Sequence, residues 1–121
     1  MTQSDKIASE TFASAMGQAV WLMSMSPDHR DLPIRDIETR VSIPLLLGQF
    51  RVYTKGKQPV AFLTWAAVTD EVKARLDAGE RPADIRDWKA GSNMVVVDCV
   101  SPFNDGAVFV KAFLDSAEHH S

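Results

Sequence analysis

The most constraining segment of this chain is the apolar run 94–100, which reads Met-Val-Val-Val-Asp-Cys-Val. Its β-branched residues predict a strand, and apolar residues at consecutive positions predict that both faces of this strand are covered. Asp98 lies inside the run, although a carboxylate is among the side chains least suited to a protein interior. The sequence therefore predicts a buried carboxylate that has a specific partner.

The best candidate partner for Asp98 is His29, which lies much earlier in the chain. Apolar residues recur at helical spacing from Phe12 onward, and Pro27 disfavours the helical conformation in the residue before it, so this helix ends near Ser26. His29 then lies in a short loop or turn. Together the imidazole and the carboxylate indicate an acid–base pair.

A purely structural use of Asp98 is the alternative. The carboxylate would then cap a helix or pair with Arg30 or Arg51.

The rest of the chain predicts further helices and strands. We first expect a helix from Pro33 to Gly48, with Asp31 as its cap and a kink at Pro44, and then two strands at 49–53 and 59–68 around a Gly-bearing hairpin turn. A short helix follows, capped by Thr69 and closed by Gly79, and then a turn at 82–88. The strand that carries Asp98 comes next, and the last element is a helix capped by Asn104 or Asp105. We expect Trp21, Trp65 and Trp88 to belong to the core.

Length and composition limit the class of protein. A chain of 121 residues that is 45% hydrophobic predicts one domain, residues 1–121, with disordered ends at 1–8 and 115–121. A net charge of −3 argues against a nucleic-acid partner. A single cysteine, Cys99, excludes an internal disulfide, and its apolar surroundings favour a core residue over a nucleophile. With no leader and no run long enough for a membrane span, we expect a cytoplasmic protein.

Four blocks of sequence resemble, in order, those of the RTX toxin-activating lysine acyltransferases. The blocks are Trp21-Leu22 with Ser26-Pro27-Asp28-His29-Arg30, Pro59-Val60-Ala61-Phe62 with Trp65-Ala66, Asp87-Trp88 with Gly91, and Asp98 with Ser101-Pro102-Phe103. The resemblance extends over residues 17 to 114, and the combination of the first and last blocks is its most specific part.

The resemblance implies a GNAT-like α+β fold, a mostly antiparallel sheet flanked by helices, in a cytoplasmic homodimer. It implies transfer of a fatty acyl group from acyl carrier protein to a lysine of an RTX-type protoxin, with His29 and Asp98 catalytic and with Ser26, Arg30 and Trp65 in support. Members of that family run further, so we expect this fold to lack their C-terminal strands. The resemblance also implies that the turn after the last strand binds the donor's phosphopantetheine, through Ser101, Phe103, Asn104 and Gly106.

The chemistry of lysine acylation fits these residues. A free lysine is almost wholly protonated near pH 7, and only the neutral amine attacks a thioester, so a base is required. His29 would be that base and Asp98 would orient its ring, while Ser26 would position backbone or carry an acyl group. No spaced set of ligands predicts a metal, and we expect no cofactor beyond the acyl-phosphopantetheine of the donor.

Two other functions remain open at this point. The chain could be a truncated, non-catalytic relative that binds a toxin or carrier protein, or a thioesterase that uses water as the acceptor. Six basic residues between Arg30 and Lys57 would suit acidic acyl carrier protein, and a solvated helix face explains them equally well.

Overall fold

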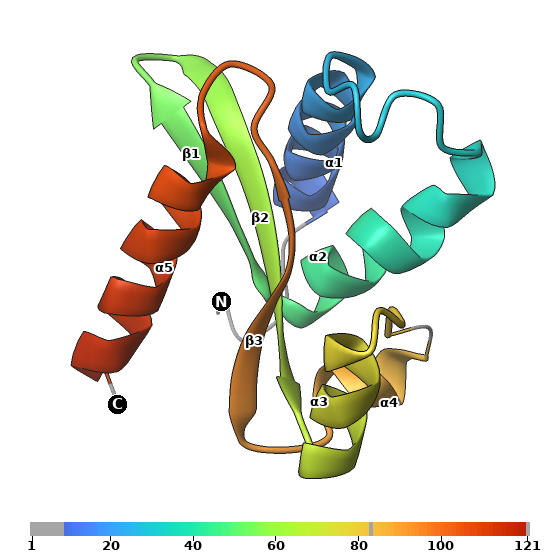
Figure 1. Ribbon diagram of the computed structural model, residues 1–121. Coiled ribbons are helices and arrows are strands. Elements are labelled where there is room, and N and C mark those ends of the chain that lie inside the picture. The colour runs from blue at the N-terminus through green and yellow to red at the C-terminus, as the bar shows by residue number, and fades with distance from the viewer. Residues whose placement is uncertain (1–8, 83, 121) are drawn as a thin grey trace.

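The computed structural model describes residues 9–82 and 84–120, which form three layers: an antiparallel sheet and a helical layer on each of its two faces (Figure 1). The strands are β1 (Phe50–Lys55), β2 (Gln58–Val68) and β3 (Asn93–Val100), in the order β1-β2-β3. Helix α5 (Gly106–His120) covers one face of the sheet. The other face carries α1 (Ser9–Ser24), α2 (Ile43–Leu47), α3 (Asp70–Asp77) and α4 (Ile85–Trp88). The predicted α+β fold is confirmed, and the arrangement is consistent with a short GNAT-like fold.

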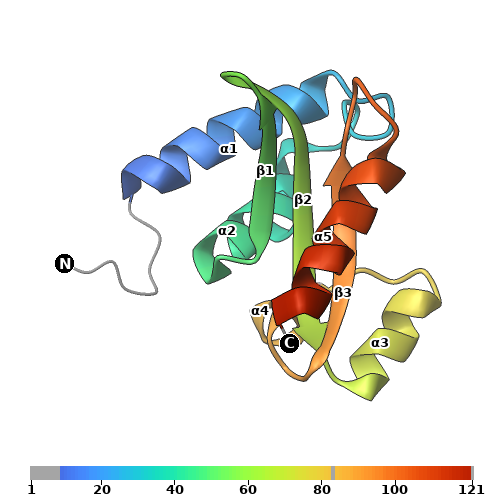
Figure 2. The same cartoon turned by 90° about the vertical axis from the view of Figure 1, so that its left-hand side faces the viewer.

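The core has a part on each side of the sheet. On the α1 side, Leu22, Leu45 and Phe62 belong to one cluster, and Val68 and Trp88 belong to a second cluster under α3 and α4. On the other side α5 lies over β2 and β3 (Figure 2), where the ring of Phe113 packs 5.9 Å from that of Trp65. Trp88 is buried as predicted, whereas Trp21 is 42% exposed, so its predicted place in the core is wrong.

The predicted helix between Pro33 and Gly48 is divided into three short pieces. These are a 3-10 turn η1 (Ile34–Asp36), a π turn η2 (Glu38–Ser42) and α2. Pro44 explains the division, because a proline has no N–H to donate and its ring clashes with the carbonyl four residues earlier. Asp31 does not cap the segment; Pro33 stands at that position and no side chain bonds there. Gly48 ends α2 with a φ of 72°, as predicted.

Strand β3 lies at an edge of the sheet within the described residues, and most of its side chains are only half-buried. The sequence predicts that both faces of this strand are covered, and helices do lie on both faces of the sheet. A run of apolar residues does not show, however, whether a strand lies at the edge or in the middle of its sheet. A bulge interrupts its pairing with β2: Thr64 lies opposite Asp98 and Trp65 opposite Val96, so Val97 has no counterpart. The bulge lies directly beside Asp98.

Several predicted turns and caps are confirmed. The β1–β2 hairpin turns at Gly56, whose φ is 63°. Thr69 caps α3 by accepting the N–H of Val72, and Asp105 caps α5 by accepting that of Ala107. Gly91 has a packing role, because a Cβ there would lie 2.4 Å from the backbone of β2.

Helix α5 is longer than the sequence predicts. Helix α5 continues to His120, through residues 115–120 that the sequence predicts as disordered. Residues 1–8 and 121, predicted as disordered too, lie outside the described residues. Within the described part, none of the helices combines the length and the apolar character that crossing a bilayer requires.

Candidate active site

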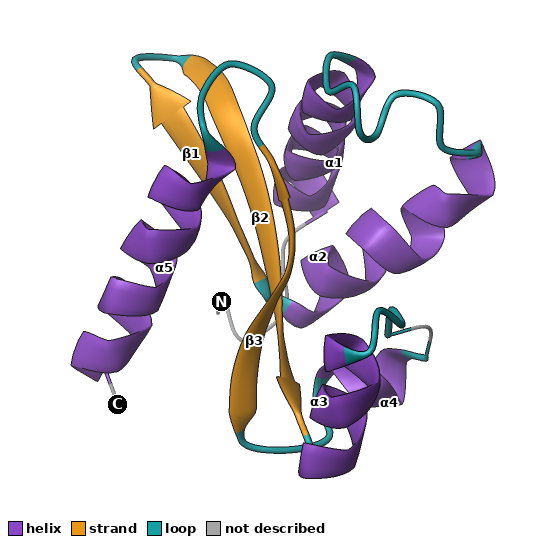
Figure 3. Cartoon of the chain, viewed as in Figure 1, coloured by secondary structure: helices purple, strands orange, loops and turns teal. Residues whose placement is uncertain are grey.

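A tight turn after α1 holds His29 against the end of β3. The carbonyl of Ser26 accepts the backbone N–H groups of both His29 and Arg30, at 3.0 and 2.9 Å. Pro27 starts this turn where the sequence predicts that the helix ends. Figure 3 shows that this loop and the loop between β3 and α5 lie at the same end of the sheet, and His29 is buried there.

Both ring nitrogens of His29 have a partner. Nε2 lies 3.0 Å from Oδ1 of Asp98, and Nδ1 lies 2.7 Å from Oγ of Ser26. An ionised carboxylate only accepts hydrogen bonds, so the network assigns the proton to Nε2. Nδ1 then accepts the hydroxyl hydrogen of Ser26. The structure therefore brings Ser26, His29 and Asp98 into one chain of hydrogen bonds.

Asp98 has two further partners that sequence reasoning missed. Arg40 Nη1 lies 3.0 Å from Oδ2, and Arg81 Nη2 lies 3.4 Å from the same oxygen. The expected alternatives, Arg30 and Arg51, are wrong as partners: Arg30 is exposed, and Arg51 lies over the ring of Phe113 on the opposite face of the sheet. The sequence feature that could have drawn attention to Arg40 is Pro44, because a proline predicts an irregular helix around it. It does not predict in which direction the side chains of that helix point.

The environment of Asp98 favours its charged form. Burial by itself raises the pKa of this carboxyl, whose side chain is only 16% exposed. The hydrogen bond and charge of His29 and the guanidiniums of Arg81 and Arg40 outweigh burial, and the pKa of Asp98 lies below its ordinary value. Asp98 is therefore an anion at neutral pH.

A small pocket of about 150 Å³ adjoins His29. Its walls are mostly aliphatic, from the end of α1 and from η1, and Arg30 and Asp36 also line it. His29 is thus buried but borders a space open to small groups, whereas Asp98 does not line this pocket.

The chain is similar in sequence to the members of one protein family. A sequence model of the RTX toxin acyltransferase family matches residues 8–119. The chain belongs to this family. The RTX-II toxin-activating lysine-acyltransferase of Actinobacillus pleuropneumoniae is 29% identical over 98 residues, which cover 81% of this chain and 61% of that protein.

Two other relatives are similar at comparable levels. A protein-lysine myristoyltransferase of Escherichia coli is 29% identical over 98 residues, 79% of this chain and 55% of the relative. The protein-lysine palmitoyltransferase of Bordetella bronchiseptica is 26% identical over 91 residues, 75% of this chain and 49% of the relative. The chain therefore spans about half to three fifths of the length of these family members.

The predicted supporting residues lie at different depths around the pair. Ser26 contacts the imidazole directly, and Arg30 contributes to the wall of the pocket beside it. Trp65 points to the opposite face of the sheet from Asp98 and packs against Phe113. Its part is to pack the sheet beneath the pair.

The predicted donor-binding residues form the turn from β3 into α5. Ser101 Oγ donates to the carbonyl of Asn104 at 2.8 Å, and the exposed ring of Phe103 lies 5.9 Å from that of Trp21. The start of α5 is less open to phosphate than we expected. The carboxylate of Asp105 already accepts the Ala107 N–H, and its negative charge opposes an anion there.

The environment of Cys99 fits the structural role expected of it. Burial, with the charge of Asp98, raises the pKa of Cys99 to about 11, so its thiol stays protonated and fits the expected structural role. Across residues 9–82 and 84–120, no group of three or more His, Cys, Asp or Glu side chains is placed to hold a metal ion.

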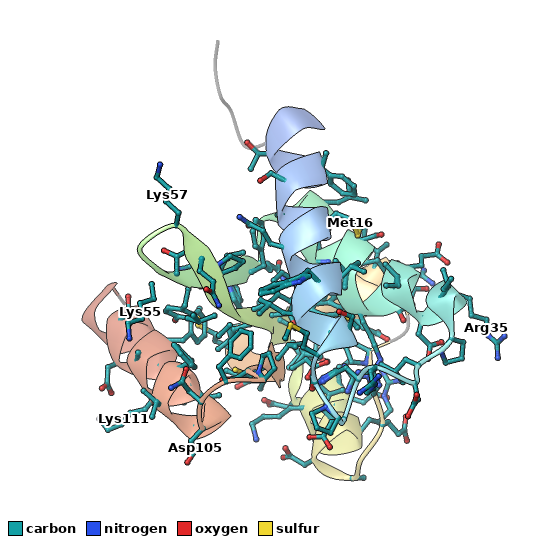
Figure 4. The ribbon with its side chains drawn as sticks, turned by 90° about the horizontal axis from the view of Figure 1, so that it is seen from above. Met16, Arg35, Lys55, Lys57, Asp105 and Lys111 are labelled. Carbon is teal, nitrogen blue, oxygen red and sulfur yellow. The ribbon has the colours of Figure 1, made fainter. Side chains whose placement is uncertain are left out.

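The basic residues between Arg30 and Lys57 do not form one surface. Seen from above in Figure 4, Lys55 and Lys57 lie on one side of the molecule and Arg35 on the other. Arg40 is turned inward to Asp98. A single basic face for acyl carrier protein, one of the two readings of this stretch, does not follow from this arrangement.

Proposed function

We propose that this chain is a protein-lysine acyltransferase that moves a fatty acyl group from acyl carrier protein to a lysine of an RTX-type protoxin in the cytoplasm. The observation that carries the proposal is the contact of His29 with Asp98, 3.0 Å apart although 69 residues separate them in the chain. Membership of a family whose relatives are named lysine acyltransferases supports the choice of reaction.

His29 is the general base of the proposed reaction. Its Nδ1 carries the lone pair, because Nε2–H donates to Asp98. As the lysine nitrogen attacks the thioester carbonyl, a C–N bond forms, and the proton lost by the nitrogen passes to Nδ1. The C–S bond then breaks, and the imidazolium returns that proton to the departing thiolate. The Asp98 carboxylate stabilises the imidazolium in between.

Ser26 controls access to the base. Its hydroxyl occupies Nδ1 at 2.7 Å, so the amine either displaces that hydroxyl or passes its proton through it. The donor is the acyl-phosphopantetheine of acyl carrier protein, a substrate and not a resident cofactor. Ser101, Phe103, Asn104 and Gly106 stay its predicted contacts, and a homodimer stays the predicted assembly.

The test is acyl transfer followed by mass spectrometry. The chain is incubated with acyl-acyl carrier protein and a lysine-bearing protoxin segment, and acylated lysine is quantified. His29→Ala and Asp98→Asn should abolish transfer, whereas Asp28→Asn, an exposed carboxylate beside His29, should leave it intact. Transfer that survives in both site variants would refute the assignment of the base.

A thioesterase is the second candidate, because Ser26, His29 and Asp98 form the order of groups that activates a serine nucleophile. In that case the donor alone would release thiol, without any lysine acceptor. A non-catalytic binding protein would instead keep its biological effect in His29→Ala and lose it on charge reversal of the exposed Arg35.

A further inference from the structure

The side chain of Arg40 reaches Asp98 from a stretch of irregular backbone. Arg40 lies within the π turn η2, in which the N–H of Ile43 donates to the carbonyl of Glu38, five residues back. The cause is Pro44, whose ring cannot lie over the carbonyl of Arg40 in a regular α-helix. The extra residue in the turn changes the direction in which Arg40 projects, and π turns of this kind are frequent at functional sites.

Asp98 lies next to an irregular position of its strand. It adjoins the bulge at Val97, and bulges redirect the side chains next to them. Two separate departures from regular secondary structure, one in a helix and one in a strand, thus meet at a single ion pair.

The two oxygens of Asp98 share its partners unequally. Nε2 of His29 lies 3.0 Å from Oδ1 and 3.3 Å from Oδ2, and Oδ2 also accepts Arg40 Nη1–H at 3.0 Å. The terminal torsion of an aspartate is broad, so a carboxylate held by the single N–H of the imidazole can rotate. The N–H of Arg40 at Oδ2 comes from a second direction; it opposes that rotation and keeps Oδ1 as the closer oxygen to the imidazole. Arg40 is only 18% exposed, whereas Arg81 is 41% exposed and more distant.

We propose that Arg40 is a positioning residue, which orients Asp98 toward His29 because the Pro44 π turn carries it there. The effect on the rate rests on the proposed function, but the effect on Asp98 does not. Within the described residues, the charged and titratable groups around the carboxylate are His29 from the turn after α1, Arg40 from η2, Arg81 from the α3–α4 loop with Asp36 near it, and Cys99 beside it in β3.

The experiment compares Arg40→Gln and Arg40→Lys with Arg35→Gln. Arg35 is exposed and points away from the body of the molecule (Figure 4), so its variant matches the loss of charge without touching the pair. Three experiments are done on each variant: the Asp98 carboxyl carbon is titrated by NMR, the signal of the hydrogen-bonded Nε2 proton of His29 is recorded, and the kinetics of acyl transfer give kcat and KM.

We expect Arg40→Gln to raise the pKa of Asp98, weaken or abolish the Nε2 proton signal, and lower kcat about tenfold to a hundredfold with KM little changed. Arg40→Lys keeps the positive charge but loses the planar guanidinium with its several N–H donors. Its Asp98 should therefore titrate nearly as in the parent protein, while its kcat should lie between those of the parent protein and Arg40→Gln. Pro44→Ala lets the segment relax toward a regular helix and should give a milder form of the Arg40→Gln result.

Two results would overturn the proposal. One is an Arg40→Gln protein whose Asp98 titration and Nε2 signal match those of Arg35→Gln. The other is a protein in which those signals change while kcat does not. If Arg40→Gln does not fold, Arg40→Lys and Pro44→Ala are measured in its place. If the unmodified chain transfers no acyl group, the proposed function fails, and the two NMR measurements alone decide whether Arg40 holds Asp98.

Discussion

Replacement of Asp98 by asparagine measures how strongly the buried ion cluster stabilises the fold. The side chain keeps its size, but its charge is lost, and an amide N–H group now faces donors. Asp98 makes two close charge-assisted bonds, to His29 and Arg40, each of about 1.5–3 kcal/mol. Arg81 adds little, because it is partly exposed and 3.4 Å away.

Part of this energy is recovered in the variant. The asparagine oxygen can keep one neutral hydrogen bond, of about 1 kcal/mol, so the net loss is about 3 kcal/mol. For 121 residues the entropy of unfolding converts this loss into a fall in Tm of about 12 °C at pH 7. Asp28→Asn, an exposed carboxylate close to the same turn, should change Tm by no more than about 2 °C.

The difference in Tm must depend on pH with a definite sign. The pKa of Asp98 is lowered in the folded state, so its contribution to stability is fully present above the ordinary carboxyl value. It is lost as the pH falls through the lower value of the folded protein. The difference in Tm between the parent protein and Asp98→Asn should therefore stay the same from pH 7 to about pH 5 and become smaller below about pH 4.

The assay is thermal unfolding followed by circular dichroism between pH 3 and pH 7. A second prediction sharpens it: Arg40→Met should cost about 2 kcal/mol less in the Asp98→Asn background than in the parent protein, because its partner is already gone. Two results would refute the view that this cluster is buried and charged. One is a decrease in Tm of less than about 3 °C at pH 7, and the other is a difference in Tm between the parent protein and Asp98→Asn that stays constant down to pH 3.

Three further predictions address the site and the fold. Ser26→Ala should lower kcat about tenfold if the hydroxyl relays a proton to His29, and loss of a base-labile acyl ester on the protein would mark it as a nucleophile instead. Gly91→Ala should lower the free energy of unfolding by more than about 2 kcal/mol, because the added Cβ would lie 2.4 Å from backbone atoms. Gly17→Ala should raise it by about 0.5–1 kcal/mol, because Gly17 lies inside α1 with open space around it. Urea denaturation of the two variants measures both changes. Thr69→Ala removes a side-chain cap and should cost about 1 kcal/mol in the same assay.

The sequence was sufficient to predict the elements that local signals define. The hairpin at Gly56, the cap at Thr69 and the end of α2 at Gly48 each depend on residues within a few positions of one another, and all three are observed. The resemblance added His29 and Asp98 as a pair, which no local pattern could join. Their contact is observed, and their catalytic roles stay predictions for the assays above.

What the sequence could not reveal were contacts that depend on irregular backbone. Helical periodicity assumes about 3.6 residues per turn, so it could not place Arg40, which lies in a wider turn. Arg81 comes from a loop whose path has no periodic signal. Trp21 was misplaced for a different reason: it lies in the regular helix α1 but on a side of it that stays exposed, where its ring lies 5.9 Å from that of Phe103.

The two nitrogens of His29 show how the local and the distant information combine. Nδ1 is the ring nitrogen nearer the backbone, so a hydroxyl three residues earlier in a tight turn can reach it, and Ser26 does so. Nε2 lies at the far end of the ring, and only another part of the fold can reach it. The motif Ser-Pro-Asp-His therefore fixes one side of the base, while the bulge in β3 and the π turn before Pro44 fix the other. A change in either irregular segment should disturb the Nε2 contact and leave the contact with Ser26 in place.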